Sequence, residues 1–166
     1  LNNLKGSFKH IKGLKVIGTI GMYDVALINT LANYGLEELD LSETLFHSDV
    51  SREGRYYFRD WVSHINDNQA TDKDAGLFVE SKTLKKVILP ESGNSSRESF
   101  MYPYDFAYCD NLETVIVKKP TDNWDDKIFY GTPLKNLVSL SSEYCDYEDF
   151  LEGCQGVTLY CPSSVN

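Results

Sequence analysis

The apolar positions of this chain recur in a phrase with fixed internal spacing. Residues 78–90 read FVESKTLKKVILP and residues 106–117 read FAYCDNLETVIV, so both contain Phe-x-x-(Ser/Cys)-x-x-Leu-x-x-Val-x-(Leu/Val). The Leu-x-x-Val-x-Leu part ends in two apolar anchors at period two, which predicts a short strand with one face turned inward. Repetition of the phrase predicts stacked copies that form a parallel sheet, with one strand per coil.

Weaker copies extend the pattern in both directions. Downstream, residues 129–137 repeat it with one residue fewer before the leucine, and residues 151–162 form a compressed last copy. Upstream, residues 36–41 contain the strand part alone, and residues 14–17 contain a fainter one. The leucines that open the strands are separated by 22, 48, 28 and 22 residues (Leu14, Leu36, Leu84, Leu112 and Leu134). A period in the twenties is that of leucine-rich repeats, and the gap of 48 equals about two periods or one repeat with an insertion.

The other anchors of the phrase predict how the coils pack. The phenylalanines lie on the descending limb of each coil and should form a buried column (Phe78, Phe106 and Phe129). The leucines that open these strands should lie in parallel register (Leu84, Leu112 and Leu134). The small Ser or Cys after each phenylalanine fits a crowded turn, where it can satisfy backbone groups. Prolines follow several strands and help to end them.

The first 45 residues follow a different pattern, which predicts an N-terminal cap. Four apolar residues recur at near-helical spacing (Met22, Val25, Ile28 and Leu31). Asp24 is the predicted N-cap of this helix and Gly35 its C-terminal cap. We therefore expect a strand at 14–20, a helix at 24–34 and a strand at 36–41. Such a strand–helix–strand unit would shield the open end of a repeat array.

The predicted fold class is α/β: a leucine-rich-repeat solenoid with short parallel strands and an N-terminal strand–helix–strand cap. Residues 1–166 form a single domain. The cap takes residues 1–45, an insertion takes 46–76, and irregular repeats take 77–166. Within the insertion, aromatic residues predict a short helix around 57–66, followed by a polar loop.

The alternation within each strand also predicts which residues face outward. Residues between the last two anchors point away from the core, and in adjacent copies they should form a continuous aliphatic stripe (Ile88, Ile116 and Val138). Outward residues two positions earlier give the stripe a polar edge (Lys86, Thr114 and Asn136). Adjacent exposed aliphatic side chains are unusual on a solvated sheet, so we interpret these residues as a candidate partner-binding surface. The alternative is that the 46–76 insertion folds over the stripe.

Composition narrows the range of partners. The formal charge is −9, from 16 basic and 25 acidic residues. Nucleic-acid backbones bind clustered Lys and Arg, so this balance argues against nucleic acid and against an anionic membrane surface. No apolar stretch reaches the roughly 18 residues of a membrane span, which predicts no direct membrane insertion in this segment. The chain begins at Leu1 without a signal-peptide pattern, and we expect that a signal peptide has been removed.

Residue types that usually carry chemistry do not form a recognisable motif. The histidines (His10, His47 and His64) lack partners at the short fixed spacing of a zinc site. The acidic loop at 67–76 lacks the EF-hand order, so we read it as a solvated turn, with weak calcium binding as the alternative. The adjacent acidic pairs at 125–126 and 148–149 are not separated across a cleft, as a glycosidase requires. We therefore predict no enzyme activity, no catalytic residue, no metal and no cofactor. The four cysteines permit disulfides without requiring them, with Cys145, Cys154 and Cys161 as candidates.

The copies at 78–90 and 106–115 resemble the leucine-rich repeats of the BspA-like bacterial surface-antigen family, whose descending limb reads Phe-x-x-Cys-x-x-Leu. Pro90-Glu-Ser92 is similar to the Ser-rich turn that follows its strands, and residues 157–162 are similar to its array-closing strand. Cys109 and Cys154 keep the family cysteine, whereas Ser81 and Thr132 replace it. The resemblance covers most of the chain, weakly at 46–76.

The resemblance implies a secreted or surface-attached bacterial protein, extracellular or on the cell surface, that is used for adhesion or partner binding. It transfers no catalytic residues. The function expected from it is non-catalytic binding of a protein or glycan on host or neighbouring cells. The alternative is a carbohydrate-binding accessory module, in which aromatic side chains outside the anchors serve as stacking platforms (Trp61, Trp124, Tyr102, Tyr104 and Tyr108).

Overall fold

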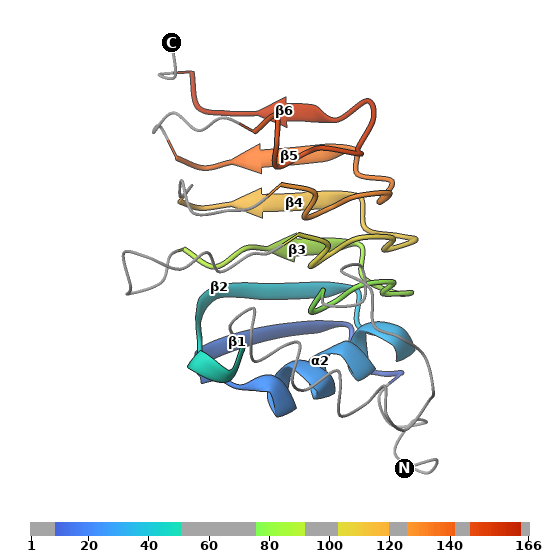
Figure 1. The fold of residues 1–166 in the computed structure, drawn as a ribbon, viewed down its shortest axis with the longest axis vertical. Helices are drawn as coiled ribbons and strands as arrows, with labels where there is room; N and C mark the ends of the chain where they lie inside the picture. Colours follow the sequence, from blue (N-terminus) through green and yellow to red (C-terminus); the bar gives the residue numbers. More distant parts are fainter. Residues whose placement is uncertain (1–8, 51–75, 92–102, 120–125, 142–146, 164–166) are drawn as a thin grey trace.

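The chain forms one sheet of six parallel strands whose order in space is their order in sequence (Figure 1). The computed structural model describes residues 9–50, 76–91, 103–119, 126–141 and 147–163. The strands are β1 (Gly13–Ile20), β2 (Glu38–Phe46), β3 (Lys86–Ile88), β4 (Thr114–Val117), β5 (Asn136–Ser139) and β6 (Thr158–Tyr160). Helix α2 (Met22–Tyr34) joins β1 to β2, and a 3-10 turn η1 (Ser48–Val50) follows β2. The α/β class and the parallel sheet are confirmed, and this architecture is compatible with a repeat solenoid.

The strands pair in the register that the phrase predicts. Val87 is paired with Val115, and Val115 with Leu137, so the central anchors form one row across the sheet. The leucines that open the strands lie two residues before aligned positions, and all of them are buried (Leu84, Leu112 and Leu134). Burying a continuous row of anchors against the next coil stabilises each strand through its neighbours, because no single coil encloses its own apolar face.

The predicted phenylalanine column is present on the side of the sheet opposite its outer face. The ring centroids of Phe78 and Phe106 are 5.0 Å apart, and those of Phe106 and Phe129 are 5.5 Å apart, in stacked geometry. Each of these side chains is 0 % exposed. Phe150 continues the column, with its centroid 5.1 Å from that of Phe129. The last copy therefore begins one residue earlier than predicted, because Phe150 rather than Leu151 occupies the column.

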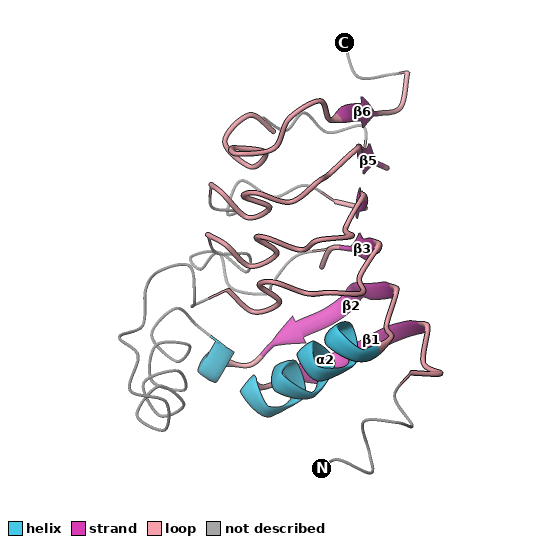
Figure 2. Cartoon of the chain, turned by 90° about the vertical axis from the view of Figure 1, so that its right-hand side faces the viewer, coloured by secondary structure: helices cyan, strands magenta, loops and turns pink. Residues whose placement is uncertain are grey.

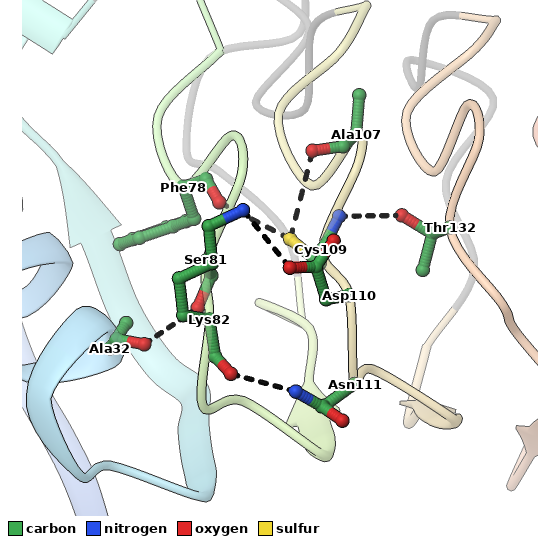
Figure 3. A network of polar contacts seen from close by, with 9 residues as sticks. All are labelled: Ala32, Phe78, Ser81, Lys82, Ala107, Cys109, Asp110, Asn111 and Thr132. Atoms are coloured by element: carbon green, nitrogen blue, oxygen red, sulfur yellow. Dashed lines mark hydrogen bonds and ion pairs between the residues drawn. The ribbon is translucent and has the colours of Figure 1, made fainter.

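The small residue of each copy links its coil to the preceding one by a side-chain hydrogen bond. Ser81 Oγ donates to the carbonyl oxygen of Ala32 at 2.9 Å. Cys109 Sγ donates to that of Phe78 at 3.3 Å (Figure 3). The same bond recurs downstream, from Thr132 Oγ1 to Phe106 O at 2.7 Å and from Cys154 Sγ to Phe129 O at 3.2 Å. The role predicted for this position, satisfying backbone groups in a crowded turn, is confirmed.

The cysteines that the structure describes are free thiols (Cys109, Cys154 and Cys161), and Cys145 lies outside the described residues. Burial raises the pKa of the Cys109 thiol to about 12 and that of Cys154 to about 11. Since the thiolate is the reactive form, the buried Cys109 and the half-buried Cys154 are poor nucleophiles, and both pack in the core of the coils.

The residue just before the small one adopts a left-handed conformation in every copy. The φ angles are +57° at Glu80, +54° at Tyr108, +69° at Gly131 and +85° at Gly153. In the later copies a tyrosine ring of the preceding coil lies over the glycine. A Cβ at Gly131 would come within 2.7 Å of the Tyr108 ring, and one at Gly153 within 2.3 Å of the Tyr130 ring. Glycine therefore meets both a backbone and a space requirement at these positions.

The N-terminal cap has the predicted strand–helix–strand order with different boundaries. Helix α2 begins at Met22, and its N-cap is Gly21 rather than Asp24. Asp24 lies three residues into the helix, where its Oδ2 accepts a hydrogen bond from the Gly21 N–H at 3.0 Å. Gly35 ends the helix as predicted, donating its N–H to Leu31 O at 3.0 Å. The buried face of the helix packs on the inner side of β1 and β2 (Figure 2).

Strand β2 begins at Glu38, two residues later than the predicted 36–41, and ends at Phe46, because it continues past a bulge. Lys15 pairs with Asp40 but Ile17 pairs with Glu43, so β2 carries one extra residue against β1. The Asp40 carboxylate accepts the Ser42 N–H at 2.9 Å within this bulge. A bulge reverses the facing of later side chains, which explains why Ser42 and Thr44 are buried and why period two fails after Leu41.

A row of charges alternates in sign across the coils just before the strands (Lys12, Glu37, Lys85, Glu113 and Lys135). The Glu37 carboxylate contacts Lys12 Nζ at 2.8 Å and Lys85 Nζ at 2.7 Å, and Lys135 Nζ contacts Glu113 at 2.6 Å. Opposite charges on adjacent coils favour this order of stacking. If a coil packed against the next but one instead of its neighbour, two like charges would lie together.

The Glu37 pairs should make stability depend on pH. Hydrogen bonds from Lys12 and Lys85 lower the pKa of Glu37 from its usual 4.5 to about 2. A carboxylate with a lowered folded-state pKa contributes stability above its unfolded pKa and loses it as the pH falls through the folded value. Urea unfolding of wild type and Glu37→Gln should therefore show wild type more stable at neutral pH. The difference should shrink between about pH 4.5 and about pH 2. A difference that stays constant over this range would contradict the assignment.

Candidate binding surface

The predicted aliphatic stripe forms one row on the outer face of the sheet. Ile88 is paired with Ile116, and Ile116 with Val138, on three adjacent strands. All three side chains are half-buried, as expected when neighbours in a row cover one another. The limbs that carry the phenylalanine column lie on the other side of β3–β6 (Figure 2). The stripe therefore faces away from the core, and its role in partner binding stays a prediction.

The predicted polar edge lies in the neighbouring row. Lys86 is paired with Thr114, and Thr114 with Asn136. Lys86 Nζ lies 3.2 Å from the Glu38 carboxylate, and Asn136 Nδ2 lies 3.3 Å from Thr114 Oγ1. These side chains contact one another along the row and form a polar border beside the aliphatic stripe. Such an aliphatic centre with a polar rim is the usual anatomy of a protein interface.

The structure adds two residues that the sequence analysis did not include. Tyr160 pairs with Val138 and continues the stripe onto β6, where it is 52 % exposed. Leu140 follows Val138 by two positions and is 57 % exposed. Alternation already contained this signal, because residue 140 has the same facing as residue 138. The sequence pattern did not indicate Tyr160, because the last copy is compressed. Each outward residue of the earlier copies follows a leucine by four positions, but the residue four positions before Tyr160 is Gly156.

A shallow concavity of about 260 Å³ continues the stripe toward the N-terminal end of the sheet. Its lining is contributed by three adjacent strands (Gly13, Leu14, Lys15, Glu38, Leu39, Asp40, Lys86 and Ile88). The absence of a side chain at Gly13 leaves this space open. Burial opposes ionisation of Asp40, but hydrogen bonds from Ser42 and the charges of Lys118 and Lys15 together lower its pKa. The concavity thus has an ionised carboxylate beside the aliphatic residue Ile88.

A lysine marks the other border of the stripe. Lys118 Nζ donates to Ser42 Oγ at 2.9 Å and lies 3.3 Å from the Glu91 carboxylate. The outer face therefore presents an apolar centre from Ile88 to Tyr160, with charged groups of both signs on its borders. We call the apolar residues of this face the outer stripe (Ile88, Ile116, Val138, Leu140 and Tyr160).

The aromatic residues considered for sugar stacking are divided by the structure. Tyr108 and Tyr130 have ring centroids 5.8 Å apart in edge-to-face geometry, and Tyr104 and Tyr130 have centroids 5.9 Å apart. These rings pack on one another along the descending limbs, and not as parallel platforms open to a sugar. Trp61, Trp124 and Tyr102 lie outside the described residues.

The residues examined for metal or acid–base chemistry do not come together in the part of the chain that the structure describes. There, no group of three His, Cys, Asp or Glu side chains is placed to hold a metal ion. His47 Nδ1 lies 2.9 Å from Asp49, and the Asp126 carboxylate contacts Lys127 at 3.2 Å. The predicted helix at 57–66, the acidic residues of the loop before Gly76, His64 and Asp125 lie outside the described residues.

Comparisons with known proteins found no match, so any function must be argued from the sequence and structure of this chain. No protein-family model, no curated protein and no solved structure matches this chain. Among the described residues, no helix has the length and apolar character needed to cross a bilayer.

Proposed function

We propose that this protein is a non-catalytic binding module, built as a leucine-rich-repeat solenoid of the BspA-like kind, that recognises a macromolecular partner through the outer stripe. The observation that carries the proposal is the in-register row of Ile88, Ile116 and Val138 on the outer face of the sheet, which ends in the exposed Tyr160. A solvated sheet would place polar side chains there, so an apolar row indicates a surface that a partner covers.

The resemblance of the repeats to the BspA-like family supports a secreted or cell-surface location, with a protein on host or neighbouring cells as the partner. A protein partner fits the row better than a sugar does, because aliphatic side chains bury area without offering a flat aromatic face. The tyrosines of the descending limbs are engaged with one another, so no observation favours the carbohydrate-binding alternative.

Ile116→Lys tests the proposal because residue 116 is the centre of the outer stripe. The lysine stem can still cover the neighbouring aliphatic side chains while its ammonium reaches water, so we expect a stability loss of at most about 1 kcal/mol. Binding should fall by tenfold or more, since a charge then occupies the middle of the apolar contact. Labelled wild type and variant would be applied to an array of purified extracellular proteins and to a glycan array.

The matched control is Tyr23→Lys, which introduces the same charge at a residue that is 80 % exposed. Tyr23 belongs to α2, the helix that packs on the inner side of β1 and β2, whereas the outer stripe lies on the outer face of β3–β6. Binding to arrayed proteins that Ile116→Lys alone abolishes would support the proposal. Binding to glycans would support the alternative. Equal binding by both variants, or a loss of several kcal/mol in Ile116→Lys, would contradict it, the latter because it would show that the stripe is internal core.

A further inference from the structure

The C-terminal edge of the sheet is open and apolar. Within the described residues, β6 pairs with β5 alone, and all three of its residues are exposed. Leu159 occupies the inward row of the sheet, where Val87, Val115 and Leu137 are 0 % exposed, yet Leu159 itself is 46 % exposed. The edge thus lacks the contacts that every other row member receives from a following coil. A leucine in a core position without a cover is a strong signal for a docked strand.

The backbone of β6 is oriented to receive such a strand. Thr158 donates its N–H to Lys135 O at 2.8 Å, so the backbone groups of Thr158 face β5. Successive residues of a strand direct their N–H and C=O to opposite sides, so those of Leu159, and of Val157 and Cys161 where the chain stays extended, face the open edge. Pro162, which has no N–H, falls on the β5 side of this alternation. The open edge therefore keeps its full set of donors.

The two edges of the sheet differ in their protection. At the opposite edge, the exposed lysine Lys12 precedes β1 and the exposed Lys15 lies within it, and the pairing of β1 with β2 is interrupted by the bulge. Charges and bulges are the usual devices that keep edge strands from pairing with other chains. The C-terminal edge has neither: no charged side chain occurs from Gly153 to Asn166, and the pairing of β6 with β5 has no register shift. Two copies that meet at this edge therefore bring no charged side chain of residues 153–166 together, which limits like-charge repulsion in a protein with a formal charge of −9.

We propose that two copies of this chain associate through β6, edge to edge and antiparallel, about a two-fold axis at Leu159. Leu159 of each copy then exchanges both backbone hydrogen bonds with Leu159 of the other, and Val157 does so with Cys161 of the second copy. On the outer face, Tyr160 lies opposite Thr158 of the second copy, and the two outer stripes join into one surface. The acidic residues Glu148, Asp149 and Glu152 flank Phe150, which belongs to the phenylalanine column on the limb opposite the strands.

The test is the mass of the 166-residue chain in solution, measured by light scattering over a wide range of concentration. We expect a concentration-dependent mass of two chains in place of the 18.9 kDa of one. Leu159→Pro removes only an N–H that faces the open edge, so it should abolish the dimer while the melting temperature of the chain changes little. Leu159→Val is the matched control: it keeps the N–H and the apolar side chain, and the dimer should persist.

A second measurement fixes the register. In an antiparallel hydrogen-bonded pair the Cα atoms are ~5.5 Å apart, which is within the range that a disulfide spans. Leu159→Cys in a Cys161→Ser background should form an interchain disulfide on mild oxidation, whereas Thr158→Cys in the same background should not. A monomer at every concentration would overturn the proposal, as would a dimer that Leu159→Pro leaves intact. A monomer whose Leu159 amide resists hydrogen exchange would also overturn it, by showing that another segment of the chain occupies the edge.

Discussion

Phe106→Ala should lower the free energy of unfolding by about 3–5 kcal/mol. The Phe106 ring is stacked between Phe78, at 5.0 Å, and Phe129, at 5.5 Å, and it is completely buried. Backbone hydrogen bonds between limbs hold the coils at a fixed separation, including Phe78 N–H to Asp105 O at 2.8 Å and Phe106 N–H to Ile128 O at 2.9 Å. The coils cannot collapse onto the hole, so the variant loses the transfer free energy of the ring and retains a cavity.

Urea unfolding followed by circular dichroism would measure this loss. Tyr23→Ala provides the control, because it removes an aromatic side chain that is 80 % exposed and should cost less than about 0.5 kcal/mol. Phe150→Ala should fall between the two, since among the described residues Phe129 is the one phenylalanine that Phe150 packs against, whereas Phe106 lies between two. A cost for Phe106→Ala below about 1 kcal/mol would show that the column does not hold the coils together.

Gly153→Ala should cost about 2–4 kcal/mol, from two separable causes. The φ angle of +85° lies in the left-handed region, which a Cβ disfavours, and the added methyl would approach the Tyr130 ring to 2.3 Å. The ring is itself held by edge-to-face contacts with Tyr104 and Tyr108, so it cannot move aside without disturbing both.

A double-mutant cycle separates the two causes. Adding Tyr130→Ala to Gly153→Ala should recover the steric part, leaving the backbone part of about 1–2 kcal/mol. Glu80→Ala is the matched control, because Glu80 occupies the equivalent left-handed position with a Cβ already present. It should be close to neutral. Additive effects of the Gly153 and Tyr130 substitutions would contradict the proposed contact between them.

Sequence periodicity was sufficient wherever a feature depends on short-range spacing. Period two in residues 87–89 and 115–117 defines which side chains face inward, and the structure confirms the row of Val87, Val115 and Leu137. Equal spacing from phenylalanine to leucine in two copies places Phe78 and Phe106 at the same height of successive coils. Identical spacing forces identical placement when the copies stack, so the outer stripe from Ile88 to Val138 followed from the same pattern.

Features that depend on contacts between distant residues could not be read in this way. The helix begins at Met22 rather than at Asp24, and Asp49, which follows β2, lies beside its first turn, with Oδ2 3.4 Å from the Met22 nitrogen. The bulge that lengthens β2 arises from its pairing with β1, and period two offers no warning of it. Phe150 enters the column because Phe129 of the preceding coil offers it a ring to pack against.

For this protein, the sequence alone determined the parallel strands, the inward and outward rows and the buried column, because each repeats at a spacing set by backbone geometry. Only the tertiary structure decided the left-handed turns covered by tyrosines, the extension of the outer stripe to Tyr160, and the difference between the two sheet edges. Those features depend on which coil lies next to which side chain. Leu159 is an example: the sequence pattern predicts that it faces the core, but no coil beyond β6 covers it among the described residues, and it is 46 % exposed.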